Sequence, residues 1–119
     1  MYLSLVIPTY NEERKIARDI EEAFKYLSVQ SFNSEVLIVN DGSLDATFAA
    51  VKKNIQELPP SNKVVFKALG YQVNRGKGYA VKYGIENASG EIIAFADSGL
   101  CVPFRYIFTG IEKIQRCSA

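Results

Sequence analysis

Residues 35–43 read Glu-Val-Leu-Ile-Val-Asn-Asp-Gly-Ser, an apolar run that ends in an acid, a glycine and a hydroxyl. The run is short and rich in β-branched side chains, which is typical of a strand. Because its apolar residues follow one another without polar alternation, both faces of the strand are expected to be buried, as in a parallel sheet covered by helices. The pattern therefore places an acid, Asp41, at the carboxyl end of a buried strand.

The same pattern occurs four times along the chain. Each short apolar run is followed by a longer segment with helical spacing, and the four runs are Tyr2–Ile7, Glu35–Asn40, Lys63–Leu69 and Glu91–Ala96. Four βα units in sequence imply a mainly parallel sheet with right-handed crossovers. We predict an α/β fold with three layers, α/β/α, in which helices cover both faces of the sheet.

The helical segments each show an apolar stripe that is expected to face the sheet. The stripes are Ile16, Ile20, Phe24 and Leu27; Phe48, Val51 and Ile55; Val81, Gly84, Ile85 and Ala88; and Ile107, Ile111 and Ile114. Breaker residues agree with these segments, with Ser43 or Asp45 as a cap for the second and Pro59-Pro60 and Ser89-Gly90 after the second and third.

Composition predicts a single domain over residues 1–119. Nearly half of the chain is apolar, at 48%, and the formal net charge is +1 with no basic stripe, which argues against nucleic-acid binding. No run is long enough to cross a bilayer and no signal peptide is evident, so we expect a cytoplasmic protein. The chain has no histidine and two cysteines, Cys101 and Cys117, which excludes zinc spacing and imidazole chemistry and leaves the cysteines as buried apolar residues.

Polar and glycine-rich residues follow all four predicted strands. In an open parallel sheet the carboxyl ends of the strands meet at one edge, where ligands bind. Carboxylates there can accept hydrogen bonds from a base or ribose, while cations and backbone N–H groups at a helix start suit phosphate oxygens. The sequence predicts a nucleotide diphosphate site at this edge, formed by residues 8–12, 41–43, 74–78 and 97–99.

Simpler interpretations of each motif stay open when it is taken by itself. Asp41-Gly42 is also typical of a turn, and residues 75–78 could form a solvated loop. Two familiar phosphate motifs do not fit. Gly70 and Gly76 have five residues between them where a P-loop has four, and a dinucleotide fingerprint would need a glycine where Val81 stands.

Three segments together resemble a known family. "LVIPTYNEE" at 5–13, "VNDGSLDAT" at 39–47 and "NRGKGYAVKYGIENASGEIIAFADS" at 74–98 are similar, in order and spacing, to the inverting family 2 glycosyltransferases with the GT-A fold. Those that make dolichyl- or polyprenyl-phosphate sugars are the nearest in pattern, and "NRGKG" resembles the glucosyltransferase branch. The resemblance covers essentially the whole chain.

The resemblance implies a nucleotide-diphosphate sugar donor, such as UDP-glucose, and a set of donor-binding residues. These would be Pro8, Tyr10 and Glu12 around the base, Asp41 and Gly42 at the base or ribose, Arg75, Gly76, Lys77 and Gly78 by the base and diphosphate, and Asp97 and Ser98 after the fourth strand. Asp97 would be the first acid of the family's Asp-x-Asp signature, a ligand for Mg²⁺ or Mn²⁺. Gly99 replaces the second acid, so metal binding is expected to be weak and dependent on nucleotide.

The implied reaction is transfer of the sugar with inversion to an acceptor, which a polyprenyl phosphate would bring to a membrane surface. The family's catalytic domain continues beyond the length of this chain, which we interpret as its N-terminal, donor-binding part with no catalytic residue of its own. A non-catalytic nucleotide-sugar-binding module is the alternative. A receiver-like signalling domain is disfavoured, because such domains cluster several acids at the end of the first strand and here only Glu12 lies near it. The fourth strand would leave a bare edge, which favours a homodimer.

Overall fold

The computed structural model describes residues 2–95, in which strands and helices alternate as predicted. The predicted fourth helix and residues 97–99 lie outside the described residues. The elements are β1 (Leu3–Thr9), α1 (Ile16–Leu27), β2 (Ser34–Asp41), α2 (Thr47–Gln56), β3 (Val64–Tyr71), α3 (Lys77–Glu86) and β4 (Ile92–Phe95).

Three of the strands end one or two residues later than the sequence predicted. The parallel ladder pairs Thr9 of β1 with Asn40 of β2, and Asp41 of β2 with Tyr71 of β3. Backbone hydrogen bonds form the ladder whatever the side chains are, so polar residues prolong the strands past their apolar runs. Asp41 and Tyr71 therefore stand side by side at the ends of neighbouring strands.

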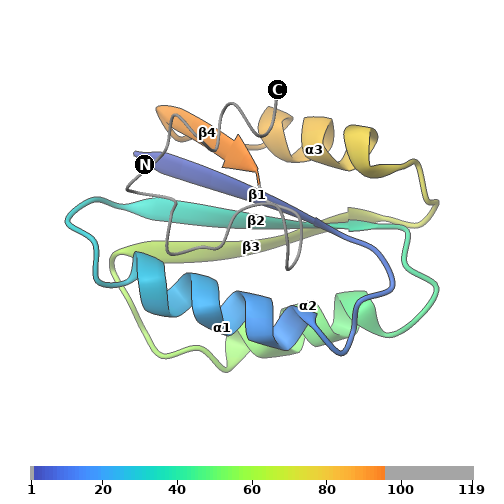
Figure 1. Cartoon of the computed structure of the whole chain (residues 1–119), viewed down its shortest axis with the longest axis horizontal. Coiled ribbons are helices and arrows are strands. Elements are labelled where there is room, and N and C mark those ends of the chain that lie inside the picture. The colour runs from blue at the N-terminus through green and yellow to red at the C-terminus, as the bar shows by residue number, and fades with distance from the viewer. Residues whose placement is uncertain (1, 96–119) are drawn as a thin grey trace.

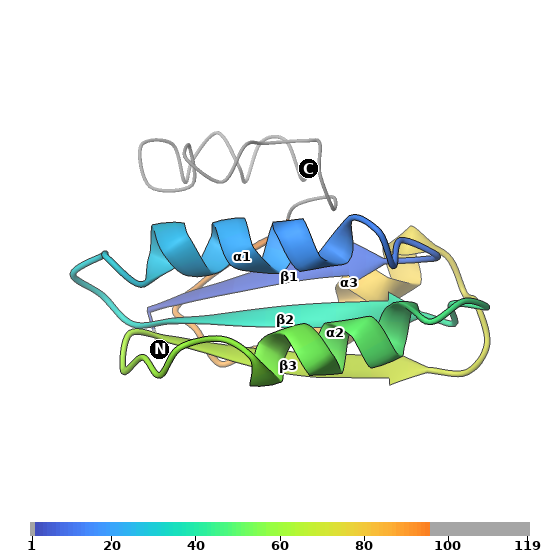
Figure 2. The same cartoon turned by 90° about the horizontal axis from the view of Figure 1, so that it is seen from below.

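The sheet is entirely parallel within the described residues, with the order β3-β2-β1-β4. Helices α1 and α2 cover one face and α3 covers the other, as the two views in Figures 1 and 2 show. The chain runs outward from β1 to β3 and then returns to the other side of β1, so the strand order reverses there. Such a reversal is where open α/β sheets bind ligands, at the carboxyl ends of the strands.

The predicted three-layer arrangement is confirmed by two apolar clusters, one on each face of the sheet. Leu5, Ile7 and Ile38 pack with α1 and α2, and Val6, Leu37 and Val39 pack beneath α3. The central strands β1 and β2 are buried along their whole length, as their continuous apolar runs indicated.

The predicted buried face of α3 is wrong in one position. Ile85 is 43% exposed, and Ala80 and Gly84 are the buried residues of the helix. A Cβ at Gly84 would lie 2.4 Å from Val6 Cγ1, so the helix lies too close to the sheet for a larger side chain. Small residues face the strands here because they permit this close packing, and Ile85 is turned outward.

Strand β4 pairs only with β1 and forms one edge of the described sheet. The edge that the sequence predicted is therefore present in this part of the chain, whereas association through it stays a prediction. Among residues 2–95, no helix combines the length and the apolar character that crossing a bilayer requires.

Candidate functional site

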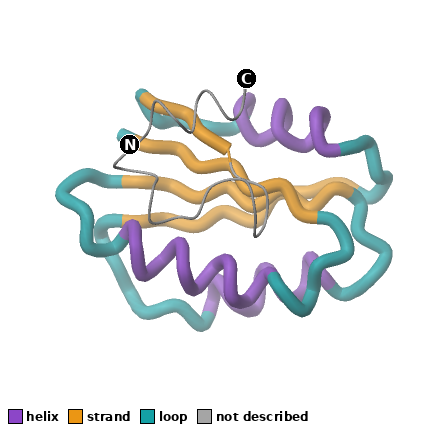
Figure 3. The backbone as a smooth tube through the Cα atoms, viewed as in Figure 1, coloured by secondary structure: helices purple, strands orange, loops and turns teal. Residues whose placement is uncertain are grey.

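The loops that carry the predicted site residues lie together at the carboxyl edge of the sheet. Residues 10–15 follow β1, residues 42–46 follow β2 and residues 72–76 follow β3. Figure 3 shows these three loops side by side at the right of the molecule. Asp97 and Ser98 lie outside the described residues, so their place relative to this edge stays a prediction.

Asp41 is the most highly bonded side chain of this edge. Its Oδ1 accepts hydrogen bonds from the Tyr71 hydroxyl at 2.8 Å and the Arg75 N–H at 2.9 Å. Its Oδ2 accepts from Asn74 Nδ2 at 2.8 Å and the Gly76 N–H at 3.0 Å. A carboxylate has about four acceptor positions, and here the protein fills all of them.

These hydrogen bonds show that Asp41 holds neighbouring parts of the backbone in place. The side chain is only 4% exposed, and its partners are the end of β3 and the turn formed by residues 74–76. Backbone N–H groups at this helix start were predicted to bind phosphate oxygens. Those of Arg75 and Gly76 donate to Asp41 instead. Asp41 therefore fixes the turn, and a nucleoside could bond to its carboxylate only if one of these donors left.

Gly42 lets the turn approach β2. Its φ is +63°, and a Cβ at this position would lie 2.2 Å from the Asn74 backbone nitrogen. Asn74 Nδ2 also donates to the Asp41 carbonyl oxygen at 3.0 Å, which holds the two segments in this contact. Both conformation and space thus require glycine next to Asp41.

The cations of the turn rest on aromatic rings. The Arg75 guanidinium lies 5.2 Å from the centre of the Tyr79 ring, and Lys77 Nζ lies 5.6 Å from that of Phe95. Tyr79 in turn meets Tyr71 edge to face, with ring centres 5.2 Å apart. These contacts place two positive charges at the start of α3, where the helix dipole already favours an anion.

Gly76 and Gly78 have different roles in the turn. Gly76 has φ +94° and precedes α3 at its N-cap, so its backbone conformation requires glycine. Gly78 has open space around the position of a Cβ, in the first turn of α3.

A second set of hydrogen bonds joins the loop after β1 to the loop after β2. Asn11, at φ +50°, receives a bond from the Leu44 N–H on its side-chain oxygen at 2.8 Å and donates its own N–H to Ser43 Oγ at 3.0 Å. The Glu12 N–H donates to Thr47 Oγ1 at 2.9 Å. These bonds hold the loop that carries the predicted site residues Tyr10 and Glu12. The third predicted residue of this segment, Pro8, lies within β1.

Thr47 begins α2 and is itself held by Asp45. Asp45 accepts the Thr47 N–H at 2.9 Å and also its hydroxyl, and these bonds lower the pKa of Asp45. Of the two predicted caps, Asp45 therefore bonds to the helix start, whereas Ser43 donates to Asn40. No side chain makes the standard cap bond at the N-cap residue, Ala46.

Sequence reasoning missed Tyr71 and Asn11 as residues that shape the site. Tyr71 lay beyond the predicted end of its strand, so its pairing with Asp41 was not visible. Asn11 lies within the predicted site segment 8–12, but only its neighbours Pro8, Tyr10 and Glu12 were predicted to contact the donor. A signal for Tyr71 exists in the sequence, because two further residues of strand bring it level with Asp41.

The described residues offer no ready metal site. Residues 2–95 contain no group of three or more histidine, cysteine, aspartate or glutamate side chains that could hold an ion. Asp97, the predicted ligand, is outside this range.

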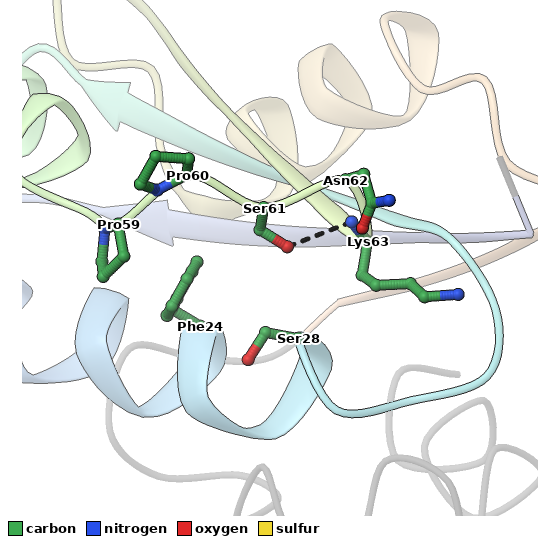
Figure 4. Close-up of a pocket in the computed structure, with 7 residues that line it drawn as sticks. All are labelled: Phe24, Ser28, Pro59, Pro60, Ser61, Asn62 and Lys63. Atoms are coloured by element: carbon green, nitrogen blue, oxygen red, sulfur yellow. Dashed lines mark hydrogen bonds between the residues drawn. The ribbon is translucent and has the colours of Figure 1, made fainter.

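An open hollow of about 700 Å³ lies at the opposite edge of the sheet, where β3 begins. Figure 4 shows its lining, which comes from the end of α1 and from the segment that leads into β3: Phe24, Ser28, Pro59, Pro60, Ser61, Asn62 and Lys63. One cation and no acid are among these residues, and none of the predicted site residues that the structure describes lines the hollow.

A parallel sheet with its polar loops gathered at one edge, beside a reversal of strand order, is the arrangement of nucleotide-binding α/β proteins. Residues 4–118 match the model of the family described as Glycosyl transferase family 2. The chain belongs to glycosyltransferase family 2, and the predicted GT-A type of fold is confirmed.

The relatives specify this resemblance further. The chain is 34% identical over 120 residues to the dolichyl-phosphate beta-glucosyltransferase of Dictyostelium discoideum, covering 97% of this chain and 36% of that protein. Among solved structures, TarS 1-349 of S. aureus in complex with UDP-GlcNAc has 26% identity and a TM-score of 0.72, covering 98% of this chain and 32% of that chain.

A mannosyltransferase from Pyrobaculum calidifontis, solved with GDP-Man and Mn²⁺, has 24% identity and a TM-score of 0.75, covering 94% of this chain and 31% of that chain, and supports the fold. The chain spans about a third of the length of the Dictyostelium relative and of the two solved chains.

Proposed function

We propose that the protein transfers a sugar from a nucleotide-diphosphate sugar to an acceptor with inversion, and that this chain supplies the donor-binding side. The observation that carries the proposal is the turn at residues 74–76, which Asp41 holds at the carboxyl edge of a family 2 domain. The turn sets Arg75 and Lys77 at the start of α3, where they would neutralise the diphosphate as it leaves.

The proposed donor is UDP-glucose and the proposed acceptor a dolichyl or other polyprenyl phosphate. This choice rests on the relatives that are dolichyl-phosphate beta-glucosyltransferases. A lipid phosphate acceptor would have the enzyme act at a membrane surface. We assign the donor-binding role to the predicted set, in which Asp41 acts by holding the turn and not by contact with the donor. The set is Pro8, Tyr10, Glu12, Asp41, Gly42, Arg75, Gly76, Lys77, Gly78, Asp97 and Ser98, and we assign no catalytic base to residues 2–95.

A divalent metal is proposed only in a supporting role. Asp97 would be its protein ligand, and Gly99 offers no second carboxylate, so Mg²⁺ or Mn²⁺ would bind weakly and with the nucleotide diphosphate. Arg75 and Lys77 would therefore carry much of the diphosphate charge, which makes them the residues to test.

The test is calorimetry on the full-length protein with UDP, UDP-glucose and GDP-mannose, followed by a transfer assay with dolichyl phosphate. Lys77→Ala is expected to weaken UDP binding by about tenfold, as for a bond between charged groups, and to change uridine binding by less than about twofold. Lys82→Ala is the matched control, an exposed lysine on the same helix.

Each outcome has a definite meaning. Binding of UDP-glucose with transfer to dolichyl phosphate supports the proposal. Binding without transfer to any acceptor would instead favour a nucleotide-sugar-binding module. Equal effects of Lys77→Ala and Lys82→Ala on UDP affinity would contradict the role given to Lys77.

A further inference from the structure

Tyr71, the last residue of β3, contacts the candidate site in two ways. Its hydroxyl donates to Asp41 Oδ1 at 2.8 Å, across the register that pairs these two residues. Its ring meets the Tyr79 ring of α3 edge to face, with an interplanar angle of 88°. One side chain therefore joins the end of β2 to the first turn of α3.

Both contacts lead to Arg75. The oxygen of Asp41 that accepts the Tyr71 hydroxyl also accepts the Arg75 N–H, at 2.9 Å. The ring of Tyr79 that Tyr71 contacts also lies beneath the Arg75 guanidinium, at 5.2 Å. The backbone of Arg75 is thus held through Asp41, and its side chain through Tyr79, with Tyr71 behind both.

The electrostatics keep Tyr71 a donor. Burial raises the pKa of its hydroxyl, and the hydrogen bond to Asp41 and the charge of that carboxylate raise it further. The phenol therefore stays protonated over the whole working range of pH, and the bond to the carboxylate is of the stronger, charge-assisted kind.

We propose that Tyr71 is a positioning residue of the donor site, which sets Arg75 against the nucleotide through Asp41 and Tyr79. The inference rests on the proposed function and deepens it. Tyr71 does not touch the ligand in this scheme; it fixes the direction of a cation that does. Fixing that direction before binding lowers the ordering cost that an exposed arginine would otherwise add.

Two substitutions separate the two contacts. Tyr71→Phe removes the hydroxyl and keeps the ring, whereas Tyr71→Leu removes both. The matched control is Tyr83→Phe, since Tyr83 packs against Tyr71 with ring centres 5.4 Å apart and its hydroxyl has no hydrogen bond to residues 2–95.

The experiment measures UDP affinity by calorimetry in the full-length protein. Loss of one hydrogen bond predicts a rise in Kd of about three- to tenfold for Tyr71→Phe, a larger rise for Tyr71→Leu and less than about twofold for Tyr83→Phe. In an Arg75→Ala background, Tyr71→Phe should add less than about twofold, because coupled residues are not additive. A general loss of stability would not produce this dependence on Arg75.

A second measurement needs no ligand. Amide hydrogen exchange at Arg75 and Gly76 should be at least about threefold faster in Tyr71→Phe than in Tyr83→Phe, since their shared acceptor loses its support. Equal exchange in the two variants, or equal UDP affinity, overturns the proposal. If the unmodified protein binds none of the nucleotides, the proposed function fails; if it binds UDP and Tyr71→Phe binds equally well, only the role of Tyr71 fails.

Discussion

Strand β2 carries a buried carboxylate near each end, and the two are built alike. Glu35 is 0% exposed and Asp41 is 4% exposed. Glu35 Oε2 accepts the Ser4 hydroxyl at 2.6 Å and both the N–H and the hydroxyl of Ser89, at 2.6 and 2.9 Å, while Lys67 Nζ lies 2.8 Å from Oε1. Like Asp41, Glu35 therefore meets four donors of the protein.

The two carboxylates differ in what they hold. Glu35, at the amino edge of the sheet, ties together the strands and the turn that leads into β4, where Gly90 also donates to Ser4 Oγ at 2.7 Å. Asp41, at the carboxyl edge, holds a loop with two cations. A buried, fully bonded acid is thus no sign of a ligand site by itself; its end of the strand decides whether the network supports the fold or a binding loop.

The largest expected effect is on stability, from Glu35→Ala. Removing the acid leaves the Ser4 and Ser89 donors buried without an acceptor, and breaking a buried charged pair typically costs about 3–5 kcal/mol. We expect the free energy of unfolding, measured by urea denaturation, to fall by about 3 kcal/mol, because the partner Lys67 is 44% exposed and regains water. UDP affinity of the folded variant should not change.

The pH dependence of unfolding checks the same network. Burial alone would raise the pKa of Glu35, but hydrogen bonds from Lys67, Ser4 and Ser89 outweigh it and lower the pKa from 4.5 to about 2. Its contribution is therefore complete above pH 4.5 and is lost as the pH falls towards 2. Glu35→Ala should flatten the unfolding profile in this window. A variant that keeps the acid sensitivity of the original would show that Glu35 is not its source.

Asp41→Ala is expected to act on both stability and binding. It should weaken UDP binding by about 1.5–3 kcal/mol, the range for hydrogen bonds to a charged group, because the turn that carries Arg75 is released. It should also lower the free energy of unfolding, since four donors lose their acceptor. Glu35→Ala is the matched control, and equal UDP affinities for the two variants would contradict the distinction between the edges.

The sequence predicted the βα alternation because apolar runs and helical stripes are local signals. It predicted the carboxyl edge as the site because parallel strands bring their ends together. The burial of Glu35 and its hydrogen bonds could not be predicted from the sequence, since its partners Ser4 and Ser89 lie 31 and 54 residues away in the chain. No local pattern distinguishes an acid that will be enclosed from one that will be solvated.

The role of Asp41 illustrates the same limit. Its position after an apolar run identified the place, but the choice between bonding to a ligand and bonding to the turn depends on where residues 74–76 return to the sheet. That return depends on glycine at position 42 and on the last pair of the β2–β3 ladder. Both are properties of the packed structure.

Asp19 of α1 is a third buried carboxyl group, and it differs from Glu35 and Asp41 because one of its oxygens accepts no hydrogen bond within residues 2–95. It is 5% exposed, and its Oδ2 has no hydrogen-bond partner among the described residues. Burial is the main cause that raises its pKa from 3.8 to about 6, and the charges of Glu12 and Glu22 add to it against the opposing charges of Arg18 and Lys15. Its ionised form is therefore a cost to the fold, the opposite of Glu35.

The smallest expected effect is a gain in stability from Asp19→Asn. A pKa raised in the folded state means that the folded protein binds the proton more tightly, so the cost is greatest above pH 6 and disappears as the pH falls below 3.8. At pH 7.5 we expect the free energy of unfolding to rise by about 1–2 kcal/mol, and near pH 3.5 to change little. Urea denaturation at the two pH values measures the difference, with Glu21→Gln, an exposed acid on the same helix, as control. A gain of equal size at both pH values would show that shape or helix propensity, and not the buried charge, separates Asp19 from the bonded acids of β2.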